Sequence, residues 1–144
     1  MLRRVPHSWI LVMVLLGIAF TLGSVVHTQK ARSEQRRQAG MQEVIANAQP
    51  VIAAIHAYQK RHKKPPKTLE SLDKSFPQPG PMAKNGWDYG YEKDKWTLAV
   101  SVNSEYTPNS GFGDTFVYRS DGQYEREAYG GILERFGEWG YYWE

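Results

Sequence analysis

The hydrophobic pattern of the chain begins with an unbroken apolar run. From Trp9 to Val26 there are eighteen consecutive residues without a charge. As a helix rising 1.5 Å per residue this run spans about 27 Å, close to the hydrocarbon thickness of a bilayer. We therefore predict a transmembrane anchor at residues 9–26, preceded by a short tail at residues 1–8 that carries Arg3 and Arg4.

The same run also fits a cleaved signal peptide. In that alternative Arg3 and Arg4 form the basic region, and Thr21 and Gly23 are the small residues of the cleavage site. We favour the uncleaved anchor, and both alternatives place the remaining residues, 27–144, in one globular head. The roughly 110 residues after the run suffice for one domain and are too few for two.

The second pattern is that of an amphipathic helix over residues 33–62. Its stripe recurs every three to four residues, at Val44, Ala48, Val51, Ile52, Ile55, Tyr58 and His62. Ser33 is expected to cap the helix, and Pro50 to bend or break it because proline lacks a backbone donor. The helix should end at the basic residues 60–64, since Pro65 and Pro66 cannot continue it.

From Trp87 onward the hydrophobic period changes to two, which indicates strands. Residues 87–91 and 96–102 form a predicted hairpin around the turn at 93–95. Residues 115–119 and 123–126 form a second one around Asp121 and Gly122. Thr68 is expected to cap a short helical turn that faces Leu69 and Leu72 inward. The fold class is therefore α+β, with the long helix packed on an antiparallel sheet of about four strands at residues 87–126.

The C-terminal tail is rich in glycine and aromatic residues. Fifteen of the nineteen aromatic residues lie between Trp87 and Trp143, which predicts that this half is folded. The tail either packs on the sheet or exposes an adhesive aromatic patch, and we favour packing because a large exposed patch promotes aggregation. The interaction candidates of the second alternative are Trp139, Tyr141, Tyr142 and Trp143.

Charge is distributed unevenly along the chain. Residues 1–67 carry eleven Lys and Arg against two acids, whereas residues 68–144 carry seven against thirteen. The basic run at the end of the predicted helix is either a solvated terminus, which complements the helix dipole, or a patch for anionic lipid or an acidic partner. No aromatic residues interleave the run as stacking on bases would require, so we expect no nucleic acid partner.

Candidate chemistry is sparse. The chain has no cysteine, which excludes disulfides, thiolate zinc sites and cysteine nucleophiles. His56 and His62 lie six residues apart, outside any zinc-binding motif, and residues 63–144 contain no histidine. Carboxylates are plentiful but show no recognisable spacing. We therefore expect no enzyme and no cofactor, and keep an envelope hydrolase only as a third hypothesis.

The order of elements is an apolar helix that continues into an amphipathic one, followed by hairpins. It is accompanied by the residues Ala57-Tyr58, Pro65-Pro66, Leu69, Leu72, Trp87-Asp88-Tyr89, Tyr91 and Trp96-Thr-Leu. Over most of residues 9–126 this layout resembles that of type IV pilins and the pseudopilins of type II secretion. The resemblance implies a helix anchored in the inner membrane and a sheet-bearing head in the periplasm. It also implies weak calcium candidates, Asp114 and Asp121, for which ordinary turn chemistry is the alternative.

The prepilin-peptidase site of that family is not matched. The nearest string, Ala19 to Gly23, lies at the far end of the apolar run and is followed by no glutamate. We therefore expect an unprocessed anchor. The positive-inside rule alone would favour a cytoplasmic C-terminus, because Lys30, Arg32, Arg36 and Arg37 follow the run. The short tail and the resemblance favour a cytoplasmic N-terminus instead.

The resulting expectation is a single-pass inner-membrane protein with its head in the periplasm or another extracytoplasmic space. It would act through protein–protein contacts in a secretion or pilus-type envelope assembly. Its expected partners are the lipid bilayer and envelope proteins, or further copies of itself. The alternative is a secreted or anchored module that binds carbohydrate or peptide through the C-terminal aromatics.

Overall fold

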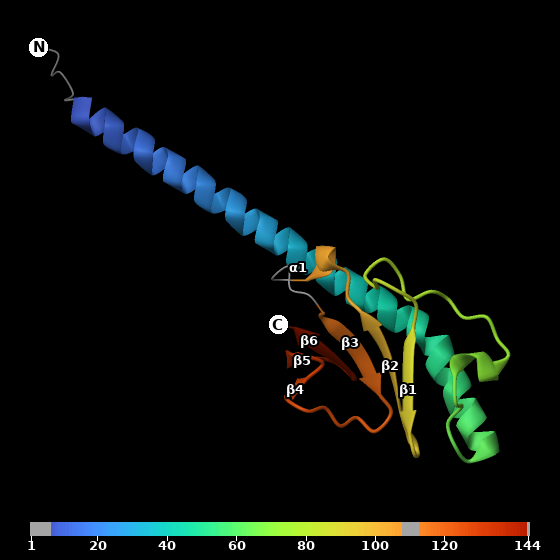
Figure 1. The fold of residues 1–144 in the computed structure, drawn as a ribbon. Coiled ribbons are helices and arrows are strands. Elements are labelled where there is room, and N and C mark those ends of the chain that lie inside the picture. Colours follow the sequence, from blue (N-terminus) through green and yellow to red (C-terminus); the bar gives the residue numbers. More distant parts are fainter. Residues whose placement is uncertain (1–6, 108–112, 144) are drawn as a thin grey trace, which may run out of the picture. The chain divides into compact units, whose positions relative to one another are not determined.

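One long α-helix, α1, opens the computed structural model and runs from His7 to His62 (Figure 1). The structure describes the backbone of residues 7–107 and 113–143, and the side chains of residues 29–107 and 113–143. The predicted end at His62 is confirmed. The predicted cap at Ser33 is wrong, because Ser33 lies inside α1 and its hydroxyl donates to the Lys30 carbonyl at 2.8 Å. Pro50 also lies within α1, so it does not break the helix.

The chain divides into two units, residues 1–35 and residues 36–144, and each is described by itself. Among the residues whose side chains are described, no helix has the length and apolar content needed to cross a membrane. The side chains of the predicted anchor at residues 9–26 lie outside that part of the chain. The anchor therefore stays a prediction.

The second unit contains an antiparallel sheet of six strands, so the fold is α+β. The strands are β1 (Asp88–Glu92), β2 (Lys95–Ser101), β3 (Thr115–Arg119), β4 (Glu127–Ala128), β5 (Gly131–Phe136) and β6 (Trp139–Trp143), in the order β1-β2-β3-β6-β5-β4. Two short 3-10 helices, η1 (Leu69–Leu72) and η2 (Ser104–Tyr106), lie in the connections. The prediction of about four strands over residues 87–126 is wrong in number and extent, because three strands, β4, β5 and β6, lie beyond residue 126.

The first predicted hairpin is confirmed, and the second is wrong in its return strand. β1 pairs with β2, but residues 123–126 form no strand, and β3 pairs with β6 instead. Tyr124 shows why, because its ring packs against Gly140 of β6, where an added Cβ would lie 2.7 Å from the ring. Its hydroxyl donates to the Glu138 carbonyl at 2.6 Å. This segment therefore crosses over the sheet, which leaves the edge of β3 open for β6.

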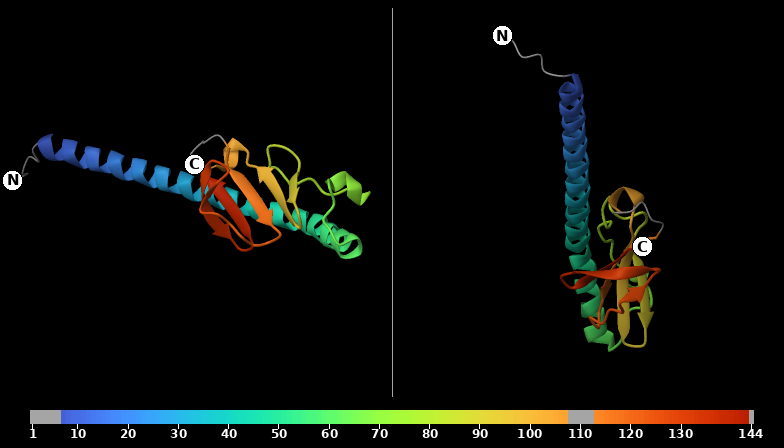
Figure 2. Two further views of the ribbon diagram at one scale, coloured as in Figure 1. Left: turned by 60° about the horizontal axis from the view of Figure 1, so that its bottom comes forward. Right: turned by 90° about the vertical axis from the view of Figure 1, so that its left-hand side faces the viewer.

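The main core lies between the sheet and the second half of α1. In both views of Figure 2, this half of the helix lies along one face of the sheet. The buried helix residues are Met41, Val44, Ala48, Val51, Ile52 and Ile55, and they meet Trp96, Leu98, Val100, Phe116, Trp139 and Tyr141 from the strands. The predicted stripe is thus confirmed from Val44 to Ile55. Each fully buried side chain of this size contributes about 1.5–3 kcal/mol through apolar burial.

A smaller cluster covers the other face of the sheet. Ala99, Val117 and Tyr142 are buried there, with Tyr124 and Leu133 packed against them. β6 therefore buries side chains on both faces, which explains why residues 139–142 are all buried. The prediction that the aromatic tail packs on the sheet is confirmed.

The turn after α1 is formed as predicted, but without the expected cap. η1 occupies Leu69–Leu72, and both leucines pack against the main core. Thr68 precedes η1 without a side-chain cap bond, and its hydroxyl lies 3.2 Å from that of Ser71 instead. The position of the turn was therefore predictable, whereas the capping chemistry was not.

Candidate functional site

Four charged or polar residues meet at the helix side of the sheet, and we name them the Arg37 cluster: Arg37, Asp114, Glu134 and Tyr141. The Arg37 guanidinium donates to both Glu134 carboxylate oxygens, at 2.9 and 3.3 Å. It also lies 4.9 Å from the centroid of the Tyr141 ring, within the range of a cation–π contact. The Tyr141 hydroxyl donates to Asp114 Oδ2 at 2.6 Å.

The cluster is a clasp between segments that are distant in sequence. Arg37 and Asp114 are both buried, which is unusual for charged residues unless they are paired. Burial, and then the neighbouring Asp114 carboxylate, raise the pKa of Tyr141 well above its usual range. The phenol therefore stays protonated and keeps donating to Asp114. The clasp joins α1, β5, β6 and the residue before β3 into one framework.

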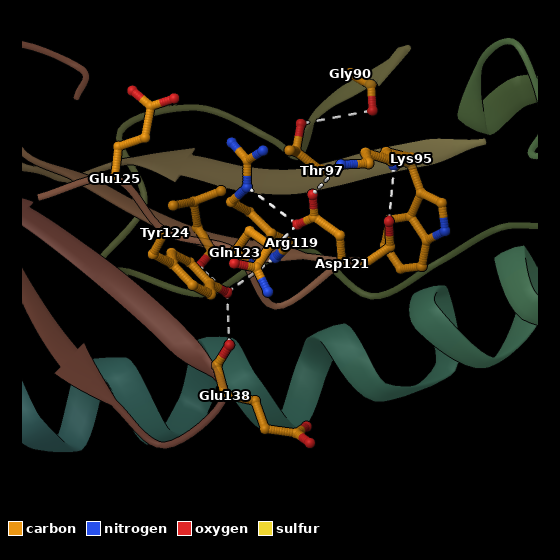
Figure 3. Close-up of polar contacts among 12 residues, drawn as sticks. Gly90, Lys95, Thr97, Arg119, Asp121, Gln123, Tyr124, Glu125 and Glu138 are labelled. Carbon is orange, nitrogen blue, oxygen red and sulfur yellow. Dashed lines mark hydrogen bonds and ion pairs between the residues drawn. The ribbon is translucent and has the colours of Figure 1, made fainter. Parts of the chain in front are cut away.

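The opposite side of the sheet carries a second group, which we name the Asp121 cluster: Lys95, Arg119, Asp121 and Tyr124 (Figure 3). Asp121 lies 3.1 Å from Lys95 Nζ, and its other oxygen accepts from Arg119 Nε at 3.4 Å. The Tyr124 hydroxyl accepts from the Arg119 backbone N–H at 2.9 Å. The predicted turn at Asp121-Gly122 is confirmed and forms the centre of this cluster.

The Asp121 carboxylate is held in its ionised form. Partial burial favours the protonated acid, but the backbone N–H of Gln123 and the Lys95 and Arg119 cations outweigh this effect. Together they lower the pKa of Asp121 to about 2. Because these donors come from the turn itself and from the ends of the adjacent strands, the cluster stabilises the β3 turn.

The two calcium candidates do not come together. Asp114 and Asp121 lie at opposite ends of β3, and a strand of that length separates them by about 20 Å. Each is already engaged, Asp114 by a tyrosine hydroxyl and Asp121 by two cations. Within the described side chains, no group of three or more His, Cys, Asp or Glu residues is arranged to hold a metal ion.

The predicted aromatic candidates lie in β6, mostly below the surface. Trp139, Tyr141 and Tyr142 are at most 3% exposed, and Trp143 is partly buried. Phe116 stacks on Trp139 with ring centroids 4.8 Å apart, and the Tyr142 hydroxyl donates to the Glu125 carbonyl at 2.8 Å. These four residues therefore form no exposed aromatic patch.

A groove that the sequence did not predict runs between α1 and the β5–β6 turn. Its volume is about 500 Å³, and it is lined by Gln42, Ile45, Gln49, Arg135, Phe136, Gly137, Glu138 and Trp139. Gln42 and Gln49 are exposed and lie off the apolar stripe of α1, but nothing in the hydrophobic pattern indicates that residues some ninety positions later lie beside them. Amides, opposite charges and a partly buried Phe136 suit contact with a polypeptide surface.

The geometry thus offers two structural clusters and one mixed polar and apolar groove, all within residues 36–144. Comparison of the chain with protein-family models, with curated protein sequences and with solved structures finds no match.

Proposed function

We propose that the chain is a membrane-anchored, pilin-like or pseudopilin-like subunit that acts through protein–protein contacts in a cell-envelope assembly. In this proposal residues 9–26 span the inner membrane, and the head lies on the periplasmic or another extracytoplasmic side. The observation that carries the proposal is the continuity of α1. The same helix contains the predicted membrane segment and the apolar stripe that closes the core of the head.

Two further features favour protein contact over the alternative of a carbohydrate- or peptide-binding module. The aromatic residues that such a module would use to bind its ligand are buried; they are Trp139, Tyr141 and Tyr142. The groove beside Gln42 and Gln49, in contrast, presents side chains of the kind found in the rims of protein interfaces.

The experiment is site-specific photocrosslinking of the full-length chain in membranes of its native host. A crosslinking residue replaces Gln42 or Gln49 in the groove. The control replaces Lys74, which is exposed and lies outside the groove. We expect discrete protein adducts from the two groove positions, identified by mass spectrometry, and far weaker adducts from Lys74. Adducts that are absent from every position, or equally diffuse at all three, would contradict the proposal.

A further inference from the structure

The end of α1 and the loop that follows it form an unusually concentrated cationic surface, which we name the basic end. Its cations are Lys60, Arg61, Lys63, Lys64 and Lys67, five charges within eight residues, and all are exposed. In the part of the chain whose side chains are described, none of the five forms an ion pair. Among the described residues, no carboxylate thus lies within ion-pair distance of the basic end.

The basic end is held firmly by the fold. The Lys63 backbone N–H donates to the Gln59 carbonyl at 2.8 Å, and Lys63 has the left-handed φ of 62° that ends the helix. Pro66 is buried, and its carbonyl accepts from the Tyr89 hydroxyl at 2.9 Å.

The β1–β2 turn provides a further attachment. The Gln59 side chain donates to the Asp94 carbonyl at 3.3 Å, which ties the last turn of α1 to that turn. The cations are therefore presented together on a fixed backbone instead of dispersing on a flexible tail.

The helix dipole accounts for only part of this charge. The C-terminal end of a helix carries the equivalent of about half a negative charge. One or two cations in the last turn satisfy it, whereas the basic end carries five. Like charges held this close repel one another, and a partner with several negative charges would relieve the repulsion.

The surrounding residues discriminate among polyanions. Nucleic acid is disfavoured because residues 60–67 contain no Trp, Tyr or Phe, and Tyr58, just before them, already has one ring face stacked on His62 with centroids 4.1 Å apart. A membrane surface is disfavoured because residues 60–67 contain no Trp, Phe, Leu or Ile that could insert among the cations.

The directions in which the cations project also disfavour a membrane surface. Successive helical residues project about 100° apart, so Lys60 and Arg61 do not face one plane. A flat bilayer would meet only some of the charges, whereas an extended chain can follow them around the helix end. We propose that the basic end binds an acidic segment of a partner polypeptide. This inference rests on the proposed function, for which it names the chemistry of the partner.

The test measures binding of a fluorescent oligo-glutamate peptide to the full-length chain held in nanodiscs of zwitterionic lipid. One variant carries Lys60→Gln, Lys63→Gln and Lys67→Gln. The matched control carries Lys30→Gln, Lys74→Gln and Lys84→Gln, which removes the same charge from exposed lysines elsewhere. We expect the first variant to bind about 30-fold more weakly at low salt, and the control to bind nearly as the wild type does. Circular dichroism confirms that both variants are folded.

Three outcomes would overturn the inference. They are absence of peptide binding, equal weakening in both variants, and binding of phosphatidylglycerol vesicles or duplex DNA in place of the peptide. The assay needs no native partner and no membrane targeting. A chain that binds the peptide through these lysines but yields no crosslinked partner in its host would therefore contradict the proposed function alone.

Discussion

The Arg37 cluster and the Asp121 cluster use the same types of side chain on opposite sides of one sheet, yet they are built differently. In the first, Arg37 and Glu134 are separated by 97 positions, and the arginine is almost completely buried. In the second, Arg119 and Asp121 lie two positions apart, and Lys95 is mostly exposed. The Arg37 cluster joins distant segments around a buried arginine, whereas the Asp121 cluster is centred on one turn and its cations are more exposed.

Removing the cation should show this difference most strongly. Arg37→Met takes away a bidentate charged pair and the cation–π contact with Tyr141, so we expect a loss of about 3 kcal/mol in unfolding free energy. Arg119→Met, the matched variant, should cost under about 1 kcal/mol because Arg119 is 29% exposed and Lys95 still pairs with Asp121. Urea unfolding followed by tryptophan fluorescence measures both. Equal losses would show that burial does not distinguish the clusters.

The two tyrosines provide a second comparison of intermediate size. Tyr141→Phe leaves the buried Asp114 carboxylate without its hydroxyl donor, so we expect a cost of about 2 kcal/mol. Tyr124→Phe removes a hydroxyl that bonds backbone groups near solvent, and should cost about 1 kcal/mol. Thermal unfolding gives both values. A larger cost at Tyr124 would contradict the conclusion that the Arg37 cluster contributes more to stability than the Asp121 cluster.

The smallest expected effect is a change in acid sensitivity. Because the pKa of Asp121 is lowered from 3.8 to about 2, its ionised form stabilises the fold above pH 3.8, and this contribution is lost as the pH falls toward 2. Asp121→Asn should be slightly less stable at pH 6 and should lose less stability than the wild type between pH 4 and pH 2. Parallel curves of unfolding free energy against pH for the two proteins would contradict the role of Lys95 and Arg119 in lowering the pKa of Asp121.

The same contrast explains what the sequence could predict. Period-2 alternation and the Asp121-Gly122 turn located β1, β2, β3 and the centre of the Asp121 cluster, because these features depend on neighbouring residues. The 3.6-residue period likewise located the stripe of α1. The Arg37 cluster and the groove required knowing that β6 lies between β3 and β5, and no local pattern carries that information.

Two errors have the same origin. Residues 123–126 were expected to pair with β3 because they follow the turn directly. Tyr124 instead contacts Gly140 and Glu138 from outside the sheet, and β6, which is buried at residues 139–142, pairs with β3. Ser33 was expected to cap a helix because it precedes the stripe, but the apolar run before it already continues the helix. In both places the local sequence pattern is outweighed by another segment, which is distant in the first case and precedes the residue in the second.

The most direct test of the central claim is the location of the intact chain in its host. Membranes are extracted with alkaline carbonate, and spheroplasts are treated with protease, with detection of the head and N-terminal sequencing of the mature protein. The proposal predicts an uncleaved N-terminus, a chain that stays in the carbonate pellet, and a head that is digested from outside. Recovery of the full-length chain from the soluble cytosolic fraction, protected from protease until the cells are lysed, would contradict it.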